Sequence, residues 1–281
     1  MPGTMTCVGI VYGLLTSLSI GAADFFGRRV ANARGPVVTG VSMQFVAIFA
    51  SIVSLAIVPS SFSVGALAIG AVSGFGLGVG LWGYFGGLQR SSSAVVAPLV
   101  ATVSAVVPYL YAIVRGSTPA PLAVGGAAVA IVGLVLITLG GGRVAHLRSG
   151  LLWGLVSGLG YGIGLSVVIE ASDASGSWPA VGQRLAACSL MLAAAARLRV
   201  DPRPPAGLRL VALAAGSVAG LSTIFYLLGV EVDATSTVVT ASLFPAVSVI
   251  VGRVVYADDV GRRQVVGLIV VLAGVILLAV S

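Results

Sequence analysis

Long apolar runs recur along the whole chain, and they constrain its fold more than any other feature of the sequence. A helix needs about 20 mostly apolar residues to cross the roughly 30 Å hydrocarbon core of a bilayer, and runs of this length follow one another with very short connections. The runs are continuous rather than alternating, and unpaired strand backbone is not tolerated in lipid, so they predict helices. The ten predicted spans are 7–27, 36–58, 63–88, 93–114, 120–140, 150–170, 179–199, 207–229, 235–255 and 262–280. The sequence therefore predicts an all-α polytopic membrane protein with ten transmembrane helices.

The charge content agrees with a bilayer as the solvent. Only 8% of the residues are charged and 58% are hydrophobic, whereas a soluble domain is about a quarter charged. The 15 basic residues outnumber the 8 acidic ones, but they are arginines scattered over short connections rather than gathered on one face. The sequence thus predicts the lipid bilayer as a partner and gives no support for nucleic acid.

The two halves of the chain resemble each other. The stretch "GIVYGLLTSLSIGAADF" from Gly9 is echoed by "GLLWGLVSGLGYGIGLS" from Gly150, and "GLQRSSSAVVAPLVATVSAVVPYL" from Gly87 is paralleled by "GVEVDATSTVVTASLFPAVSVIV" from Gly229. Because five is an odd number, a repeat of five helices places the two copies in opposite orientations. We therefore predict two inverted five-helix repeats, residues 1–145 and 146–281, which is an architecture of transporters.

The positions of the arginines predict the orientation in the membrane. Connections that follow odd-numbered spans hold thirteen of the fifteen, and positively charged connections face the cytoplasm. We therefore expect a multi-pass protein of the cell (inner or plasma) membrane, with the odd-numbered connections cytoplasmic and both termini extracytoplasmic. The thirteen are Arg28, Arg29, Arg34, Arg90, Arg143, Arg148, Arg197, Arg199, Arg203, Arg209, Arg253, Arg262 and Arg263.

The end of the chain carries a family resemblance. The stretch "SLFPAVSVIVGRVVYADDVGRRQVVGLIVVLAGVILL" resembles the signature of the EamA branch of the drug/metabolite transporter superfamily. In that signature a proline in the ninth helix precedes an acidic turn, a Gln-x-x-Gly and a final Gly-Val. The matching residues here are Pro245, Ala257-Asp258-Asp259, Gln264, Gly267 and Gly274-Val275.

The first half matches this family more loosely. "SSSAVVAPL" fits, but Val103 stands where the proline is expected and Gly116 where the acidic residue is expected. The Arg-Phe pair typical of the second helix of each half is replaced by Gln44-Phe45 and Arg184-Leu185. The resemblance implies a secondary carrier of small metabolites, often an exporter, and it does not name the substrate.

Two ionisable residues within the spans are the strongest pointers to function, because charges in a membrane are costly. Asp24 lies in "GAADFFGRR", and Arg28 is four residues on, on the same side of a helix. We expect an interfacial Asp24–Arg28 pair, with a group at the inner mouth of the transport pathway as the alternative. Arg184 is expected either to snorkel outward or to brace the bundle by pairing with Glu170 and Asp173. The alternative is a cationic anchor for a substrate carboxylate.

Polar and aromatic residues within the spans are further candidates for the substrate pathway. Tyr161 ranks first among the aromatic residues because it lies nearest to mid-span, and Ser104 and Ser248 are additional mid-span hydroxyls. Proline lacks a backbone donor, so Pro98, Pro108 and Pro245 are expected to interrupt the fourth and ninth helices. We expect residues 91–93 and 235–237 to cap these same two helices. The complete set of predicted pathway residues is Asp24, Gln44, Trp82, Tyr84, Thr102, Tyr109, Tyr161, Arg184, Tyr226, Ser242 and Pro245.

The sequence gives little support for catalysis. His146 is the single histidine and lies in a connection, and Cys7 and Cys188 are far apart without metal-ligand spacing. We therefore predict no catalytic residues, no metal and no cofactor, and a protein that is not an enzyme. The predicted function is a secondary transporter that exports small metabolites, such as amino acids or related amphipathic compounds, by alternating access through a central cavity. The alternatives are a drug or cation efflux carrier and a non-transport membrane scaffold or enzyme, and a homodimer is left open.

Overall fold

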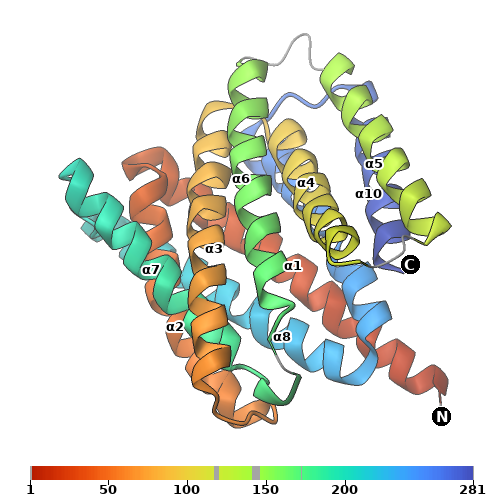
Figure 1. Cartoon of the computed structure of the whole chain (residues 1–281). Coiled ribbons are helices and arrows are strands. Elements are labelled where there is room, and N and C mark those ends of the chain that lie inside the picture. The colour runs from red at the N-terminus through yellow and green to blue at the C-terminus, as the bar shows by residue number, and fades with distance from the viewer. Residues whose placement is uncertain (1, 117–119, 141–145, 172, 281) are drawn as a thin grey trace.

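The chain forms a bundle of helices (Figure 1) in a computed structural model that describes residues 2–116, 120–140, 146–171 and 173–280. Within these residues there are ten α-helices, two short 3₁₀ helices and no strand. The helices are α1 (Pro2–Arg34), α2 (Pro36–Ile57), α3 (Val64–Arg90), α4 (Ser93–Val114), α5 (Pro121–Gly140), α6 (Leu147–Val168), η1 (Asp173–Ser175), α7 (Trp178–Leu198), η2 (Ala206–Leu208), α8 (Arg209–Ala241), α9 (Phe244–Tyr256) and α10 (Arg262–Ala279).

Most of these helices can cross a membrane. Eight are long and apolar enough by length and composition, and the segments Pro121–Ile137 and Phe244–Tyr256 are shorter apolar helices. The prediction of an all-helical, polytopic membrane protein is therefore confirmed, and the chain is a multi-pass membrane protein.

Helix α1 is longer than the predicted span 7–27. It continues through its first charged residues and ends at Arg34, because Gly35 takes a left-handed conformation (φ 85°) and Pro36 begins α2. Asp24 therefore lies ten residues before the end of the helix, which corresponds to about 15 Å at 1.5 Å per residue. Asp24 thus lies well within the helix rather than near its end.

The predicted ninth span, 235–255, is not a single helix. The backbone of α8 is non-helical at Asp233 (φ −156°, ψ 96°), which separates the eighth span from a short helical segment ending at Ala241. A turn over residues 242–243 then leads into α9. Pro245 is the second residue of α9 and has no N–H, so it cannot continue the helical hydrogen bonding back to Ala241.

The caps of the two matching helices differ. Ser92 caps α4 as predicted, because its hydroxyl accepts a hydrogen bond from the N–H of Ala94 at 3.2 Å. In the second half the cap is Asp233 rather than a residue of 235–237, since its carboxylate accepts from the Ser236 N–H at 3.2 Å. Helix α4 is also continuous through Pro98 and Pro108, so the expected interruption occurs only in the ninth span.

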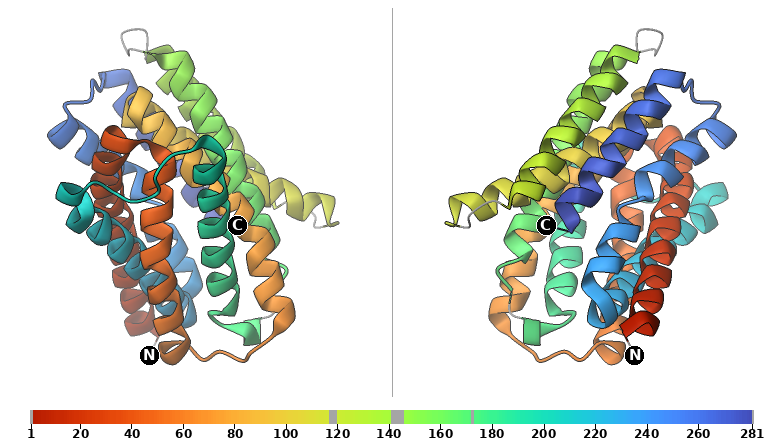
Figure 2. Two further views of the ribbon diagram at one scale, coloured as in Figure 1. Left: turned by 90° about the vertical axis from the view of Figure 1, so that its left-hand side faces the viewer. Right: turned by 90° about the vertical axis from the view of Figure 1, so that its right-hand side faces the viewer.

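The helices pack in pairs that join the two halves of the chain. Helix α3 packs on α6 and α7, while α8 packs on α1 and α2. Helix α4 contacts α6 and α9 contacts α1, and α5 and α10 lie side by side (Figures 1 and 2). Every one of these pairs takes one helix from each half, so neither half buries its apolar faces alone.

Small residues allow the closest of these contacts. A Cβ added at Gly160 of α6 would lie 2.6 Å from the backbone nitrogen of Gly80 in α3, so only glycine fits there. Hydroxyls reinforce the contact in both directions: Ser73 donates to the carbonyl of Gly164, and Ser157 donates to that of Gly80, each at 2.7 Å. Such small-residue packing is how helices associate within lipid.

Candidate functional site

The carboxylate of Asp24 is buried where α1, α3 and α9 converge. Its Oδ2 accepts a hydrogen bond from the Tyr84 hydroxyl at 2.6 Å and another from the hydroxyl of Ser248. Glycines on either side of Asp24 permit this approach, since a Cβ at Gly21 would collide with Val247 of α9 and one at Gly27 with Phe85 of α3. The structure thus brings together two predicted pathway residues, Asp24 and Tyr84, with one of the additional mid-span hydroxyls.

The expected Asp24–Arg28 pair is not formed. Instead, both terminal nitrogens of Arg28 donate to the carboxylate of Asp258, each at 2.8 Å. The backbone N–H and the hydroxyl of Ser93 also donate to Asp258, at 2.8 and 2.6 Å. A bidentate arginine–carboxylate pair is stronger than a single contact, which explains why Arg28 turns away from its neighbour on α1.

An aromatic ring completes the surroundings of Arg28. The guanidinium carbon lies 4.5 Å from the centre of the Tyr256 ring, and the Tyr256 hydroxyl donates to the carbonyl of Phe25 at 2.6 Å. The space between this ion pair and the Asp24 cluster measures about 10 Å³, room for at most one water molecule. Side chains therefore close the bundle at this end. We call the Arg28–Asp258 pair the first latch.

A second polar cluster surrounds Arg184 on α7. Its two terminal nitrogens donate to Gln44 of α2 at 3.1 Å and to Thr223 of α8 at 2.6 Å, and its buried Nε has no hydrogen-bond partner. Both partners are neutral, so within the described residues the guanidinium charge has no paired carboxylate. Gln44 and Arg184, which the sequence predicts as matching positions in the two halves, form a direct hydrogen bond.

The expected partners of Arg184 lie elsewhere. Glu170 accepts hydrogen bonds from Tyr111 of α4 at 2.8 Å and from Arg115 at 3.3 Å. Glu170 and Arg115 are exposed and lie just beyond the ends of α6 and α4. The side chain of Asp173 lies outside the described part of the structure. The predicted brace from Arg184 to Glu170 is therefore wrong. We call the Arg115–Glu170 pair the second latch.

Tyr161 lies within electrostatic range of both polar clusters. Its ring packs directly over Gly80 of α3 and against the apolar core that contains Tyr84 and Phe85. It is close enough to both Asp24 and Arg184 to interact with their charges. The aromatic residue ranked first among the candidates is thus the one next to both clusters.

The other predicted pathway residues lie apart from these clusters. Thr102 and Tyr109 on α4 each have a buried hydroxyl without a partner. Trp82 packs edge-on against Trp153 and is 37% exposed, and Tyr226 is 38% exposed. Ser242 and Pro245 form the turn and start of α9, where the Ser242 hydroxyl donates to the carbonyl of Val238 at 2.7 Å.

Three participants were not among the predicted site residues. Thr223 is one hydroxyl among many in apolar helices, and no local pattern distinguishes it. Asp258 stood out as part of the acidic turn, but its partner is 230 residues away in sequence. Ser93 was expected only as a cap, and it instead binds Asp258. Among the described residues no group of three or more His, Cys, Asp or Glu could hold a metal ion.

Comparisons with known proteins agree with this architecture. Residues 148–280 match the model of the EamA-like transporter family. No curated protein sequence matches the chain. One crystal structure is similar over 98% of this chain and 97% of the other, with a TM-score of 0.60 and 16% sequence identity, which shows a shared fold alone. The second half of the chain is thus similar to the EamA-like transporter family, and this match and the membrane-spanning helices together support a membrane transporter.

Proposed function

We propose that the protein is a secondary transporter that exports small metabolites, such as amino acids or related amphipathic compounds, by alternating access. The observation that carries this proposal is the pair of polar clusters around Arg184 and Asp24, both within electrostatic range of Tyr161. Export as the direction of flux rests on the family resemblance.

The Arg184 cluster supports a substrate with a carboxylate. A charge inside a membrane protein is expensive unless it is paired, and such residues mark substrate pathways. Gln44 and Thr223 satisfy two nitrogens of Arg184 without neutralising its charge, and its Nε is left over. A substrate carboxylate supplies both the missing charge and the missing acceptor.

The Asp24 cluster supports a cationic group or a proton as the second ligand. The carboxylate of Asp24 accepts two hydroxyl hydrogen bonds, and within the described residues it has no ion-pair partner. A zwitterion therefore matches the two clusters, with its carboxylate at Arg184 and its ammonium group towards Asp24. Tyr161 offers an aromatic surface to the apolar part of the same molecule.

The two latches support alternating access between inverted repeats. In a five-plus-five repeat α6 corresponds to α1 and α4 corresponds to α9. The helix contacts agree with this correspondence, because α1 packs on α9 and α6 packs on α4. The first latch joins α1 to the segment after α9, and the second joins the segment after α6 to the segment after α4. The basic residue lies on α1 in the first latch, whereas an acidic residue follows the corresponding helix α6 in the second latch, so the acidic and basic positions are exchanged. Because the two proposed repeats run in opposite directions, the two latches belong to opposite ends of the bundle. A carrier needs a closure at each end.

The arginine distribution supports placing the first latch on the cytoplasmic side. Arg28 belongs to the connection after the first span, one of the odd-numbered connections that are rich in arginine. On this assignment both termini lie outside the cytoplasm.

A metabolite panel in a thermal-shift assay tests the proposed substrate class. We expect amino acids or related carboxylates to raise the melting temperature of the detergent-purified protein, and Arg184→Gln to abolish this shift while the protein remains folded. The matched control is Arg253→Gln, an exposed arginine of α9. Stabilisation by cationic drugs that survives Arg184→Gln and is lost in Asp24→Asn favours the drug or cation carrier instead.

A further inference from the structure

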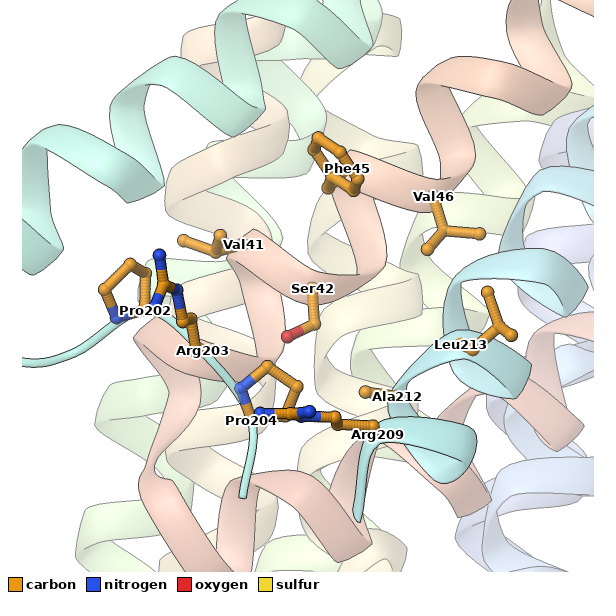
Figure 3. A pocket seen from close by; sticks show the side chains of 10 residues that line it. All are labelled: Val41, Ser42, Phe45, Val46, Pro202, Arg203, Pro204, Arg209, Ala212 and Leu213. Atoms are coloured by element: carbon orange, nitrogen blue, oxygen red, sulfur yellow. The ribbon is translucent and has the colours of Figure 1, made fainter. Parts of the chain in front are cut away.

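A groove runs along the outer side of the bundle, away from both polar clusters. It lies between the first part of α2 and the first part of α8, and its volume is about 590 Å³ (Figure 3). The residues that line it are Val41, Ser42, Phe45, Val46, Pro202, Arg203, Pro204, Arg209, Ala212 and Leu213.

The floor of the groove is apolar and faces the membrane. Phe45 is 58% exposed and Leu213 is 51% exposed, and both belong to helices that cross the bilayer. Val46 lies ten residues into α2, about 15 Å from the helix start, so the groove extends well along a membrane-spanning helix. It ends where Val46 packs over Gly216 of α8.

The rim of the groove is basic. Arg203 is held between Pro202 and Pro204, whose rings fix the backbone around it, and Arg209 is the first residue of α8 (Figure 3). Both arginines are exposed, and in the described part of the chain neither forms an ion pair. The nearby Asp201 carboxylate accepts a hydrogen bond from the backbone N–H of Arg203 at 3.0 Å.

We propose that this groove binds one anionic phospholipid. The acyl chain lies along Phe45 and Leu213, and the phosphate lies between the guanidinium groups of Arg203 and Arg209. Arginine matches the geometry of phosphate oxygens, and basic pockets between transmembrane helices bind anionic lipid headgroups. The combination of an apolar floor at membrane depth and two unpaired cations at its surface end favours a lipid over a peptide or a second copy of the chain.

Native mass spectrometry of the detergent-purified protein tests the proposal. We expect one phosphatidylglycerol to remain bound in preference to phosphatidylcholine at equal concentration. The double substitution Arg203→Ala/Arg209→Ala is expected to weaken phosphatidylglycerol binding about thirtyfold, which corresponds to about 2 kcal/mol for two arginines near a lipid headgroup. The matched control is Arg262→Ala/Arg263→Ala, which removes the same charge from exposed residues outside the groove.

A second variant tests the acyl chain separately. Ser42→Phe fills the groove while leaving both arginines in place, and we expect it to weaken phosphatidylglycerol binding as well. If the two double substitutions weakened phosphatidylglycerol binding equally, the effect would come from overall charge, and the proposed site would be wrong. If inorganic phosphate or glycerol phosphate displaced the lipid at matched concentration, the groove would be a site for small anions rather than for a lipid. Disulfide-linked dimers of Phe45→Cys, in a background without Cys7 and Cys188, would assign the face to a second copy.

Discussion

Asp24 and Arg28 lie one turn apart on α1, yet their side chains take partners from different parts of the chain. Asp24 binds Tyr84 and Ser248, whereas Arg28 binds Asp258. Local spacing favours a pair between them, worth about 0.2–0.5 kcal/mol on an exposed helix. A buried bidentate pair that also accepts from Ser93 outweighs this preference, so the roles of the two residues are separate.

Breaking the first latch should destabilise the protein strongly. Arg28→Gln leaves the carboxylate of Asp258 buried without its partner, and the side chains of the pair are 10% and 7% exposed. We expect the free energy of unfolding to fall by about 3–5 kcal/mol, measured by denaturant titration in detergent. The double variant Arg28→Gln/Asp258→Asn should recover part of the loss, because neither remaining group is charged. Additive losses would contradict a direct pair.

Neutralising Asp24 should separate its structural role from a role in transport. In Asp24→Asn the amide oxygen still accepts from Tyr84 and Ser248, so we expect the melting temperature to stay the same or rise. If Asp24 carries the coupling proton, the pH dependence of transport across vesicle membranes disappears in this variant. Transport with an unchanged rate and pH profile would leave Asp24 with a structural role alone.

At the scale of helices, the apolar pattern predicted which segments are helical and missed where two of them end or break. Helix α1 continues past Arg28 because that charge is paired inside the bundle, and no hydropathy pattern contains this information. Its true end, Gly35-Pro36, carries ordinary stop and start signals. The break in the ninth span follows from Pro245, whereas α4 is continuous through its two prolines.

The contact between α3 and α6 should be intolerant of a single added methyl group. Gly160→Ala places a Cβ 2.6 Å from the backbone nitrogen of Gly80, so the helices must separate. We expect a loss of about 1–3 kcal/mol in the free energy of unfolding, as for other overpacked sites. Gly125→Ala is the control, since no atom lies within 4 Å of its added Cβ and alanine favours a helix. Equal effects of the two substitutions would argue against close packing at Gly160.

At the scale of the whole molecule, contacts between the halves determine the site. Gln44 and Arg184 were predicted separately, and their direct hydrogen bond depends on the packing of α2 against α7. Thr223 and Asp258 join the clusters through contacts that no spacing in the sequence contains. The residue types of the site could therefore be predicted, but their partners could not.

Opening of the first latch should expose the small space beside Asp24. Val251 lines that space, so Val251→Cys in a background without Cys7 and Cys188 reports its accessibility to a maleimide. We expect Arg28→Gln to increase the rate of labelling in membranes, because the closure at this end is weakened. The control is Arg115→Gln, which alters the exposed second latch. A labelling rate that Arg28→Gln leaves unchanged would mean that the ion pair does not close this end.

Counterflow in proteoliposomes tests the central claim, alternating access by a carrier, most directly. Vesicles are loaded with an unlabelled compound selected by the thermal-shift panel and diluted into a trace of the same compound carrying an isotope label. We expect the label to accumulate transiently inside, because a carrier exchanges one bound molecule for another, and we expect Arg184→Gln to abolish this accumulation. Vesicles that contain folded protein and show no accumulation for any stabilising compound would contradict the account.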